Sequence, residues 1–419
     1  SDGRQRLLSD PLPLRRSTVF PDYRVDAVLP WVYGRATLTP IPLDRDGLEY
    51  LIADHPIISV EGVRNDGANV DGWELVQTVD ATGSAVAYLY LSQPPDGALA
   101  VDVVGRRHPE TGALLEHPAD IAEDLLRACG WSIPSGAFDV LRDTYPAVAL
   151  GGVFDAATTV REAVSTVLGS IDADWCGSPL SAWLPEPGEP IGTLTPRNCP
   201  EIRAESTHAD LCTRLRVAYG YDWAAGAPRG SLVVESPEHL ERLGEIEQDV
   251  DLPWVRTARD ALALATARLR RRARPRWDFT LSLPLGERYR PGDALTLADP
   301  WAPTGAVMVS AVERGRTGQT LTAHRYAGDP PRVELVGRGQ LIDAAGADVI
   351  RVDYKDGVAT FTILNELGQP LAGASVTLDG AETRTTDRGG QVQFVTERGL
   401  HALLVTANGY APLEMEVVI

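Results

Sequence analysis

The chain has 419 residues, a formal net charge of −19, 39 glycines and 31 prolines. This length predicts two to four domains with cores of their own, and the turn-forming residues favour β structure over a helical bundle. The acidity disfavours non-specific binding to nucleic acid, and the sequence lacks the run of roughly 18 apolar residues that a membrane-spanning helix needs.

The first part of the chain predicts an arm followed by a β domain. Residues 1–24 are polar, lack the apolar core of a signal peptide and are expected to form an extended arm. Residues 25–115 contain six strand-like runs separated by Asp, Asn and Gly, which favours a first β domain shaped as a barrel or sandwich. The segment RNDGANVDG (64–72) has oxygens that could hold Ca²⁺, but a hairpin turn is the simpler interpretation.

Residues 116–183 predict a small α/β insertion. Three helical patterns, 117–131, 136–146 and 157–175, surround one strand-like run at 148–155. Asp172 and Asp174 end the third helical pattern and are interpreted as capping or solvated groups.

Residues 184–256 are expected to return to β structure and to include a solvated acidic connector over 235–251. A helix then begins near residue 257 and leads into a second β domain, which ends near residue 335. Six arginines crowd the end of this helix and the next strand: Arg268, Arg270, Arg271, Arg272, Arg274 and Arg276. Clustered arginines can bind phosphate, but the favoured interpretation is structural: they complement the helix dipole and pair with carboxylates of 235–251.

Residues 346–419 predict a third module, a small sandwich of short strands. The four cysteines, Cys129, Cys176, Cys199 and Cys212, form no CxxC pair and are expected to be free and mostly buried thiols. The seven histidines are scattered, and no nucleophile elbow, zinc-protease motif, P-loop or dinucleotide fingerprint is present. We therefore expect no catalytic residue, cofactor or metal site, and interpret the chain as a non-enzyme.

Three stretches resemble one family. LPWVYGRATLTPIPL (29–43) with LEYLIADHPIISVEGVRNDG (48–67) is similar to the opening β domain of hub and baseplate proteins of phage tails. DIAEDLLRACG (120–130) with VREAVSTVLGSIDADW (160–175) resembles the helical insertion of that family. Residues 257–300 look like its helix–strand–PGD–strand return. The resemblance spans about 25–330, and it identifies the arginine-rich segment as the helix end that leads into the second β unit.

A separate resemblance covers the C-terminal module. LGQPLAGASVTLDG (367–380) and TTDRGGQVQFV (385–395) are similar to the carboxypeptidase regulatory-like, transthyretin-type sandwich. The fold class expected for the whole chain is therefore mainly β with an α+β insertion: two tube-like β-barrel or sandwich modules plus a small C-terminal Ig- or transthyretin-like sandwich.

The hub resemblance implies a structural virion protein that forms a homotrimeric ring at the distal end of the tail tube and lines the DNA exit channel. The implied partners are further copies of the chain, the tail tube or distal tail protein, and tip, spike or fibre proteins. DNA would pass without specific binding during genome ejection, and the C-terminal domain could contact host-surface glycan. Such a protein assembles in the host cytoplasm. Candidate anchors between subunits are Trp31, Trp73, Trp254 and Trp301, although core packing is the simpler role for most of them.

Two other classes of protein remain open. A secreted or surface protein that binds glycan or a protein partner would also place β modules in series. A tail-associated hydrolase is the enzymatic alternative, for which the sequence shows no acid/base or metal constellation.

Overall fold

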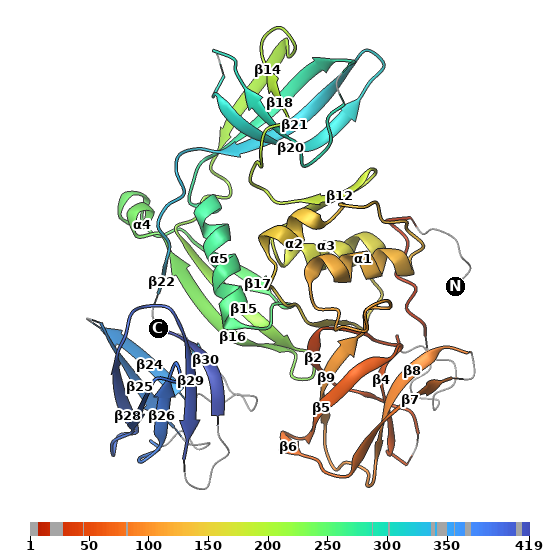
Figure 1. The fold of residues 1–419 in the computed structure, drawn as a ribbon, viewed down its shortest axis with the longest axis vertical. Coiled ribbons are helices and arrows are strands. Elements are labelled where there is room, and N and C mark those ends of the chain that lie inside the picture. Colours follow the sequence, from red (N-terminus) through yellow and green to blue (C-terminus); the bar gives the residue numbers. More distant parts are fainter. Residues whose placement is uncertain are drawn as a thin grey trace.

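The structure is a computed structural model, and its mainly β content with a few helices confirms the expected fold class (Figure 1). It describes residues 7–16, 28–44, 46–80, 83–286, 288–300, 302–336, 340–341, 350–355, 357–364, 370–407 and 413–419. Among the described residues, no helix is long and apolar enough to cross a membrane.

The first β domain consists of two four-stranded sheets around a shared core of Ile52, Leu89, Val101 and other apolar residues. One sheet has the order β2 (Arg35–Leu38), β9 (Leu99–Arg106), β5 (Ile57–Asn65) and β6 (Ala68–Asn69). The other has the order β3 (Ile41–Pro42), β4 (Glu49–Ala53), β8 (Ala85–Leu91) and β7 (Trp73–Val79). The β5–β6 connection is a hairpin turn, since Asp66 and Gly67 have φ values of 47° and 85°.

The α/β insertion joins the first domain through a short ladder between β1 (Trp31–Tyr33) and β10 (Gly152–Phe154). Its helices are α1 (Pro118–Ala128), α2 (Asp139–Thr144) and α3 (Val160–Gly169), followed by the hairpin β11 (Asp174–Gly177) and β12 (Leu180–Trp183). Helix α3 begins with a capping box, in which Thr159 and Glu162 satisfy each other's backbone amides. Its buried face includes Val164, Val167 and Leu168.

A central layer follows, built from β15 (Arg214–Asp222), β16 (Ala227–Glu235), β17 (Glu247–Leu252) and α5 (Ala258–Arg272). Alternate residues of the sheet, such as Leu215 and Val217, share one core with Leu264 and Leu269 of α5. The expected acidic connector contains regular structure, α4 (Pro237–Leu243) and β17. Its charges are solvated as expected, but β17 has a backbone partner because it pairs in parallel with β15.

A six-stranded sheet wraps around its own core of Leu281, Leu295, Val309 and other apolar residues. Its order is β13 (Gly192–Leu194), β19 (Ala294–Leu297), β20 (Gly305–Arg314), β21 (Gly318–Tyr326), β18 (Arg276–Pro284) and β14 (Glu201–Thr207). We call this unit the distal barrel. Strands from the expected β return (184–256) and from the expected second domain (257–335) therefore share one sheet.

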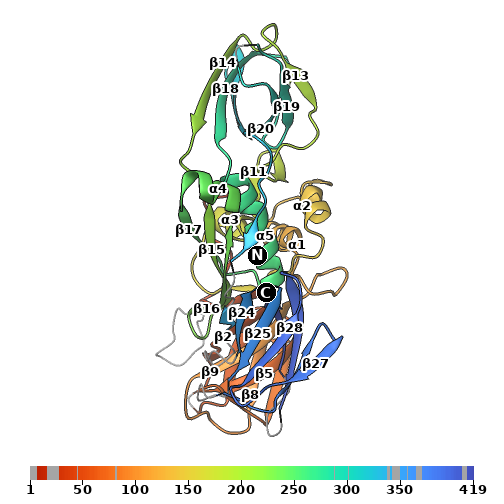
Figure 2. The same cartoon turned by 90° about the vertical axis from the view of Figure 1, so that its left-hand side faces the viewer.

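The distal barrel and the first β domain lie at opposite ends of the molecule in both views (Figures 1 and 2). The two β domains expected at 25–115 and 257–335 therefore do not lie side by side within one chain. The β unit that adjoins the first domain is instead the central layer (Figure 1).

The C-terminal sandwich has its own core, centred on Phe361 and Phe394, whose ring centroids lie 5.7 Å apart. Its second sheet has the order β27 (Glu382–Thr385), β26 (Ser375–Leu378), β29 (Leu400–Thr406) and β30 (Leu413–Val418). Its first sheet contains β24 (Ile350–Lys355), β25 (Val358–Ile363) and β28 (Gln391–Val395). The short strands β22 (Glu334–Leu335) and β23 (Gln340–Leu341) both pair with β16, and β23 also pairs with β24, so the central sheet continues into the sandwich.

Candidate functional site: charged joints between domains and an acidic sheet face

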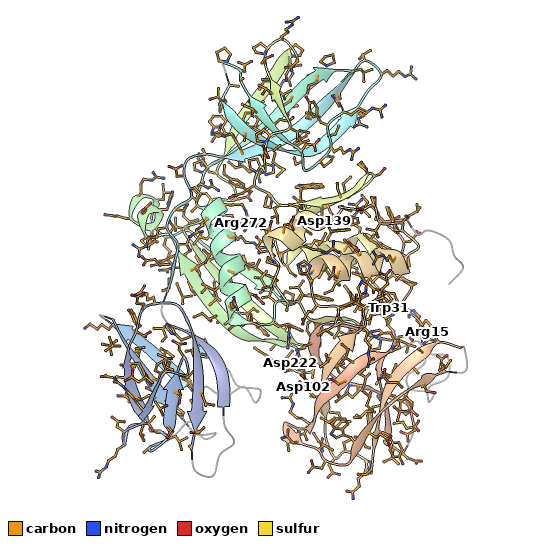
Figure 3. The ribbon with its side chains drawn as sticks, in the orientation of Figure 1. Arg15, Trp31, Asp102, Asp139, Asp222 and Arg272 are labelled. Carbon is orange, nitrogen blue, oxygen red and sulfur yellow. The ribbon has the colours of Figure 1, made fainter. Side chains whose placement is uncertain are left out.

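The first β domain and the central layer meet at a half-buried ion network. Arg229 of β16 donates to Asp222 at 2.8 Å and to the Thr37 hydroxyl of β2 at 2.5 Å. Its guanidinium lies 3.7 Å from Asp102 of β9, which also binds Arg64 at 2.9 Å. Figure 3 shows Asp102 and Asp222 where the two units meet. Burial opposes ionisation of Asp222, but backbone amides and Arg229 outweigh it and hold its pKa below the usual range.

An aromatic row continues this junction into the insertion. The ring centroid of Trp254 lies 4.8 Å from that of Phe154 of β10 and 6.2 Å from that of Trp223. The Trp223 ring in turn contacts Tyr221 at 5.4 Å, and its backbone amide donates to the Thr37 carbonyl at 3.0 Å. The row therefore packs the first domain, the insertion and the central layer against one another.

Two of the four candidate tryptophan anchors are core residues instead. Trp254 is 3% exposed, and Trp31 is 6% exposed beneath the Arg106 guanidinium. Neither side chain offers surface to a second subunit, because both pack at internal domain boundaries. Trp73 is half-buried on strand β7, and Trp301 lies outside the described residues.

The arginine-rich end of α5 forms a second joint. Arg268 and Arg271 are 8% and 5% exposed, and both pair with Asp172, which follows helix α3 in the insertion. Arg268 also donates to the Gly169 carbonyl at 3.1 Å. Burial alone would raise the pKa of Asp172, but the two guanidinium groups hold it below its usual range.

The same cluster extends to the distal barrel. Arg274 donates to Glu186 at 2.7 Å and lies 5.3 Å from the Tyr326 ring centroid. Arg276 pairs with Asp210 at 2.8 Å. The structural interpretation of the cluster is confirmed, but its carboxylate partners differ from those expected. They are Asp172, Glu186, Asp210 and Asp278 rather than residues of 235–251, because α5 packs its last turn between the insertion and the barrel.

The central sheet presents an acidic face on the side away from α5. Glu247, Asp249 and Asp251 alternate along β17 and are exposed. Arg214 and Arg216 of β15 neutralise part of this charge, with Arg214 binding Glu235 at 2.9 Å and Glu245 at 2.8 Å, and Arg216 binding Glu247 at 2.7 Å. A face with surplus carboxylates repels phosphate.

Among the described strands, β7 and β14 each pair with another strand on one side and lie at the edge of their sheets. Strand β7 ends its sheet in the first domain, and its Val79 side chain is 61% exposed. Strand β14 ends the sheet of the distal barrel. Edge strands leave backbone hydrogen-bonding groups unpaired and favour pairing with another chain.

The described residues contain no group of three or more His, Cys, Asp or Glu side chains that could hold a metal ion. Cys129, Cys199 and Cys212 are buried free thiols as expected, and Cys176 is half-buried. Burial raises the pKa of Cys199 and of Cys212 to about 11, which keeps both thiols protonated and unreactive at neutral pH.

No protein-family model matches the chain. No curated protein matches it either. Among solved structures, the chain is similar to a protein in the virion of a native gene transfer agent particle, with 13% identity over 79% of this chain and 90% of that chain and a TM-score of 0.47. It is also similar to a tail protein from Neisseria meningitidis MC58, with 13% identity, 70% and 97% coverage and a TM-score of 0.33. A third similar structure is prophage tail protein gp18 from Listeria monocytogenes EGD-e, with 11% identity, 72% and 95% coverage and a TM-score of 0.33.

Proposed function

We propose that the chain is a structural protein of a phage-type tail: a hub that forms a homotrimeric ring at the distal end of the tail tube and joins the tube to tip proteins. One observation carries the proposal. The three stretches that resemble tail hub proteins, 29–67, 120–175 and 257–300, fall on the first β domain, the insertion and the α5-to-barrel segment. The Arg271–Asp172 pair joins α5 to the insertion, and the aromatic row packs the insertion and the first β domain against the central layer.

In this proposal the bore is lined by the first β domain and the adjoining central sheet, rather than by the distal barrel. The carboxylates of Glu247, Asp249 and Asp251 support this choice, since a passage for DNA must not grip a moving polyanion. Two arginines of α5, Arg268 and Arg271, are held in internal ion pairs with Asp172 and are buried away from the proposed bore.

The edge strands supply the surfaces that would close the ring. A ring needs contacts that repeat from subunit to subunit, and an uncovered edge strand such as β7 gains backbone partners in such a contact. Trp73 lies on β7 and is the candidate anchor for this contact. The C-terminal sandwich would lie outside the ring, toward tip proteins or host-surface glycan.

Electron microscopy of particles from cells that produce the chain with a C-terminal tag tests the proposal. Gold-labelled antibody against the tag is expected at the distal end of the tail, and loss of the gene is expected to leave tubes without tips. Absence of the chain from purified particles would overturn the proposal. Binding of the full chain to glycans on an array, together with its absence from purified particles, would favour the surface-protein alternative.

A further inference from the structure

The N-terminal arm contacts two domains at once. Residues 7–16 run across the boundary between the α/β insertion and the first β domain. On the insertion side, the Leu12 amide donates to the Thr158 carbonyl at 2.8 Å. On the other side, the Arg15 carbonyl accepts from the Leu29 amide at 2.9 Å.

Backbone carbonyls of the arm accept hydrogen bonds from the first amides of helix α3. The first amides of a helix have no acceptor within the helix. The Val160 amide donates to the Asp10 carbonyl at 2.9 Å, and the Arg161 amide donates to the Leu8 carbonyl at 3.0 Å. The next amide, that of Glu162, donates to the Thr159 side chain at 3.2 Å and does not depend on the arm.

Arg15 holds the arm to the first β domain. Its guanidinium donates to Asp54, whose side chain is 4% exposed, with an Nε–Oδ2 distance of 2.9 Å. It also pairs with Asp80 at 2.5 Å. Asp54 lies just after β4 and Asp80 just after β7, so one side chain ties the arm to two strands of the same sheet.

Within the described residues, the arm forms no continuous β ladder with either domain. The sequence Pro11-Leu12-Pro13 lacks two backbone donors, and in the part of the chain that the structure describes the β-type pairing of the arm consists of single bridges, Pro11 with Thr159 and Arg16 with Val28. An open pocket of about 700 Å³ borders the arm and is lined by Pro11 to Arg15 and by Trp31, Asp54, His55 and Arg106. Leu12 is the one residue of 7–16 that is buried in the core.

We propose that residues 7–16 form a releasable strap that clamps the α/β insertion to the first β domain, with Arg15 as its lock. When the strap leaves as a unit, the Val160 and Arg161 amides lose their acceptors while the rest of α3 stays folded. The two domains then remain joined by the β1–β10 ladder, by the Arg106–Asp124 ion pair and by the aromatic row. This inference is independent of the proposed function.

Residue-resolved hydrogen exchange on the full chain tests the strap. In Arg15→Ala, the Val160 and Arg161 amides are expected to exchange at least about ten-fold faster than in the unchanged chain. Losing a hydrogen bond to a charged group shifts the opening equilibrium by about ten-fold or more. The Glu162 amide serves as the internal reference and is expected to keep its rate. Arg203→Ala, at an exposed arginine on β14 that pairs with Glu201, is the matched control.

Asp80→Asn is a milder variant that removes the charge of the more exposed partner of Arg15 but keeps an oxygen acceptor, and it is expected to give an intermediate acceleration. Unchanged exchange at Val160 and Arg161 in both variants would overturn the proposal. Equal acceleration at Glu162 would overturn it too, because the arm and α3 would then open together and no separate strap would exist.

Discussion

Arg271 and Asp172, 99 residues apart in the sequence, form an ion pair between the last turn of α5 and the segment that follows α3. Asp172 adopts a φ of 60°, a left-handed conformation that aspartate tolerates better than most residues. The pair is completed by Arg268 at 3.1 Å. A single carboxylate thus neutralises two largely buried guanidinium groups at the boundary between the insertion and the central layer.

Replacing Asp172 with alanine is expected to lower the free energy of unfolding by about 3 kcal/mol, because it leaves two buried arginines without their counter-ion. Chemical denaturation measures this change. Asp249→Ala is the matched control, since its side chain is 76% exposed, and is expected to change stability by less than about 0.5 kcal/mol. Equal effects of the two substitutions would contradict the assigned role of Asp172.

Local patterns predicted much of this fold but not its joints. The strand-like runs within 25–115 and the hairpin turn within 64–72 are predicted correctly, as strands β5 and β9 and the Asp66–Gly67 turn show, because both signals act between near neighbours. The sequence predicts a capping or solvated role for Asp172, which is wrong because the packing of α5 brings two arginines that are distant in sequence against it. The same limit explains why the distal barrel was divided between two expected domains.

Trp254 and Trp73 are expected to have different roles, Trp254 in the stability of the fold and Trp73 in contacts between subunits. Trp254→Ala is expected to lower the free energy of unfolding by about 3–5 kcal/mol, because it opens a cavity between Phe154 and Trp223. Trp73→Ala is expected to cost less stability, since Trp73 is half-buried, and to weaken self-association. Thermal unfolding and light scattering on both variants check these outcomes. If Trp254→Ala weakened self-association at temperatures where it stays folded, the assignment of Trp254 to stability alone would be wrong.

His55 is expected to make stability depend on pH. The imidazole accepts a hydrogen bond from the Val32 amide at 2.9 Å and is 5% exposed. Burial, with the nearby Arg106 charge, lowers its pKa to about 3. The folded chain therefore stays unprotonated at His55 while the unfolded chain takes up a proton below about pH 6.5. The contribution of neutral His55 to the free energy of unfolding is fully present above that pH and is lost as the pH falls toward 3.

The contribution of His55 is isolated by comparison with His55→Gln between pH 6.5 and 5, where most carboxylates keep their charge. The unchanged chain is expected to lose roughly 1 kcal/mol per pH unit more than the variant in urea titrations. His208→Gln, at an exposed histidine, is the control and is expected to follow the unchanged chain. Parallel pH profiles for the chain and His55→Gln would refute the buried neutral state.

The acidic face is expected to matter for DNA passage rather than for folding. The double substitution Asp249→Lys and Asp251→Lys places cations on the proposed bore, and particles that carry it are expected to deliver DNA at least about ten-fold less efficiently. Asp143→Lys with Asp155→Lys makes the same charge change on exposed positions of the α/β insertion and is expected to leave delivery unchanged. Particle counts by microscopy separate failed delivery from failed assembly. Normal delivery by the first variant would remove Asp249 and Asp251 from the bore.

The ring itself is the central claim, and native mass spectrometry of the purified chain across a range of concentrations tests it most directly. One chain has a mass of 45.1 kDa. The account predicts a species of three chains whose share grows with concentration at the expense of the single chain. Trp73→Ala is expected to shift this equilibrium toward the single chain. A single chain at every concentration, both alone and in extracts of assembled tails, would contradict the account.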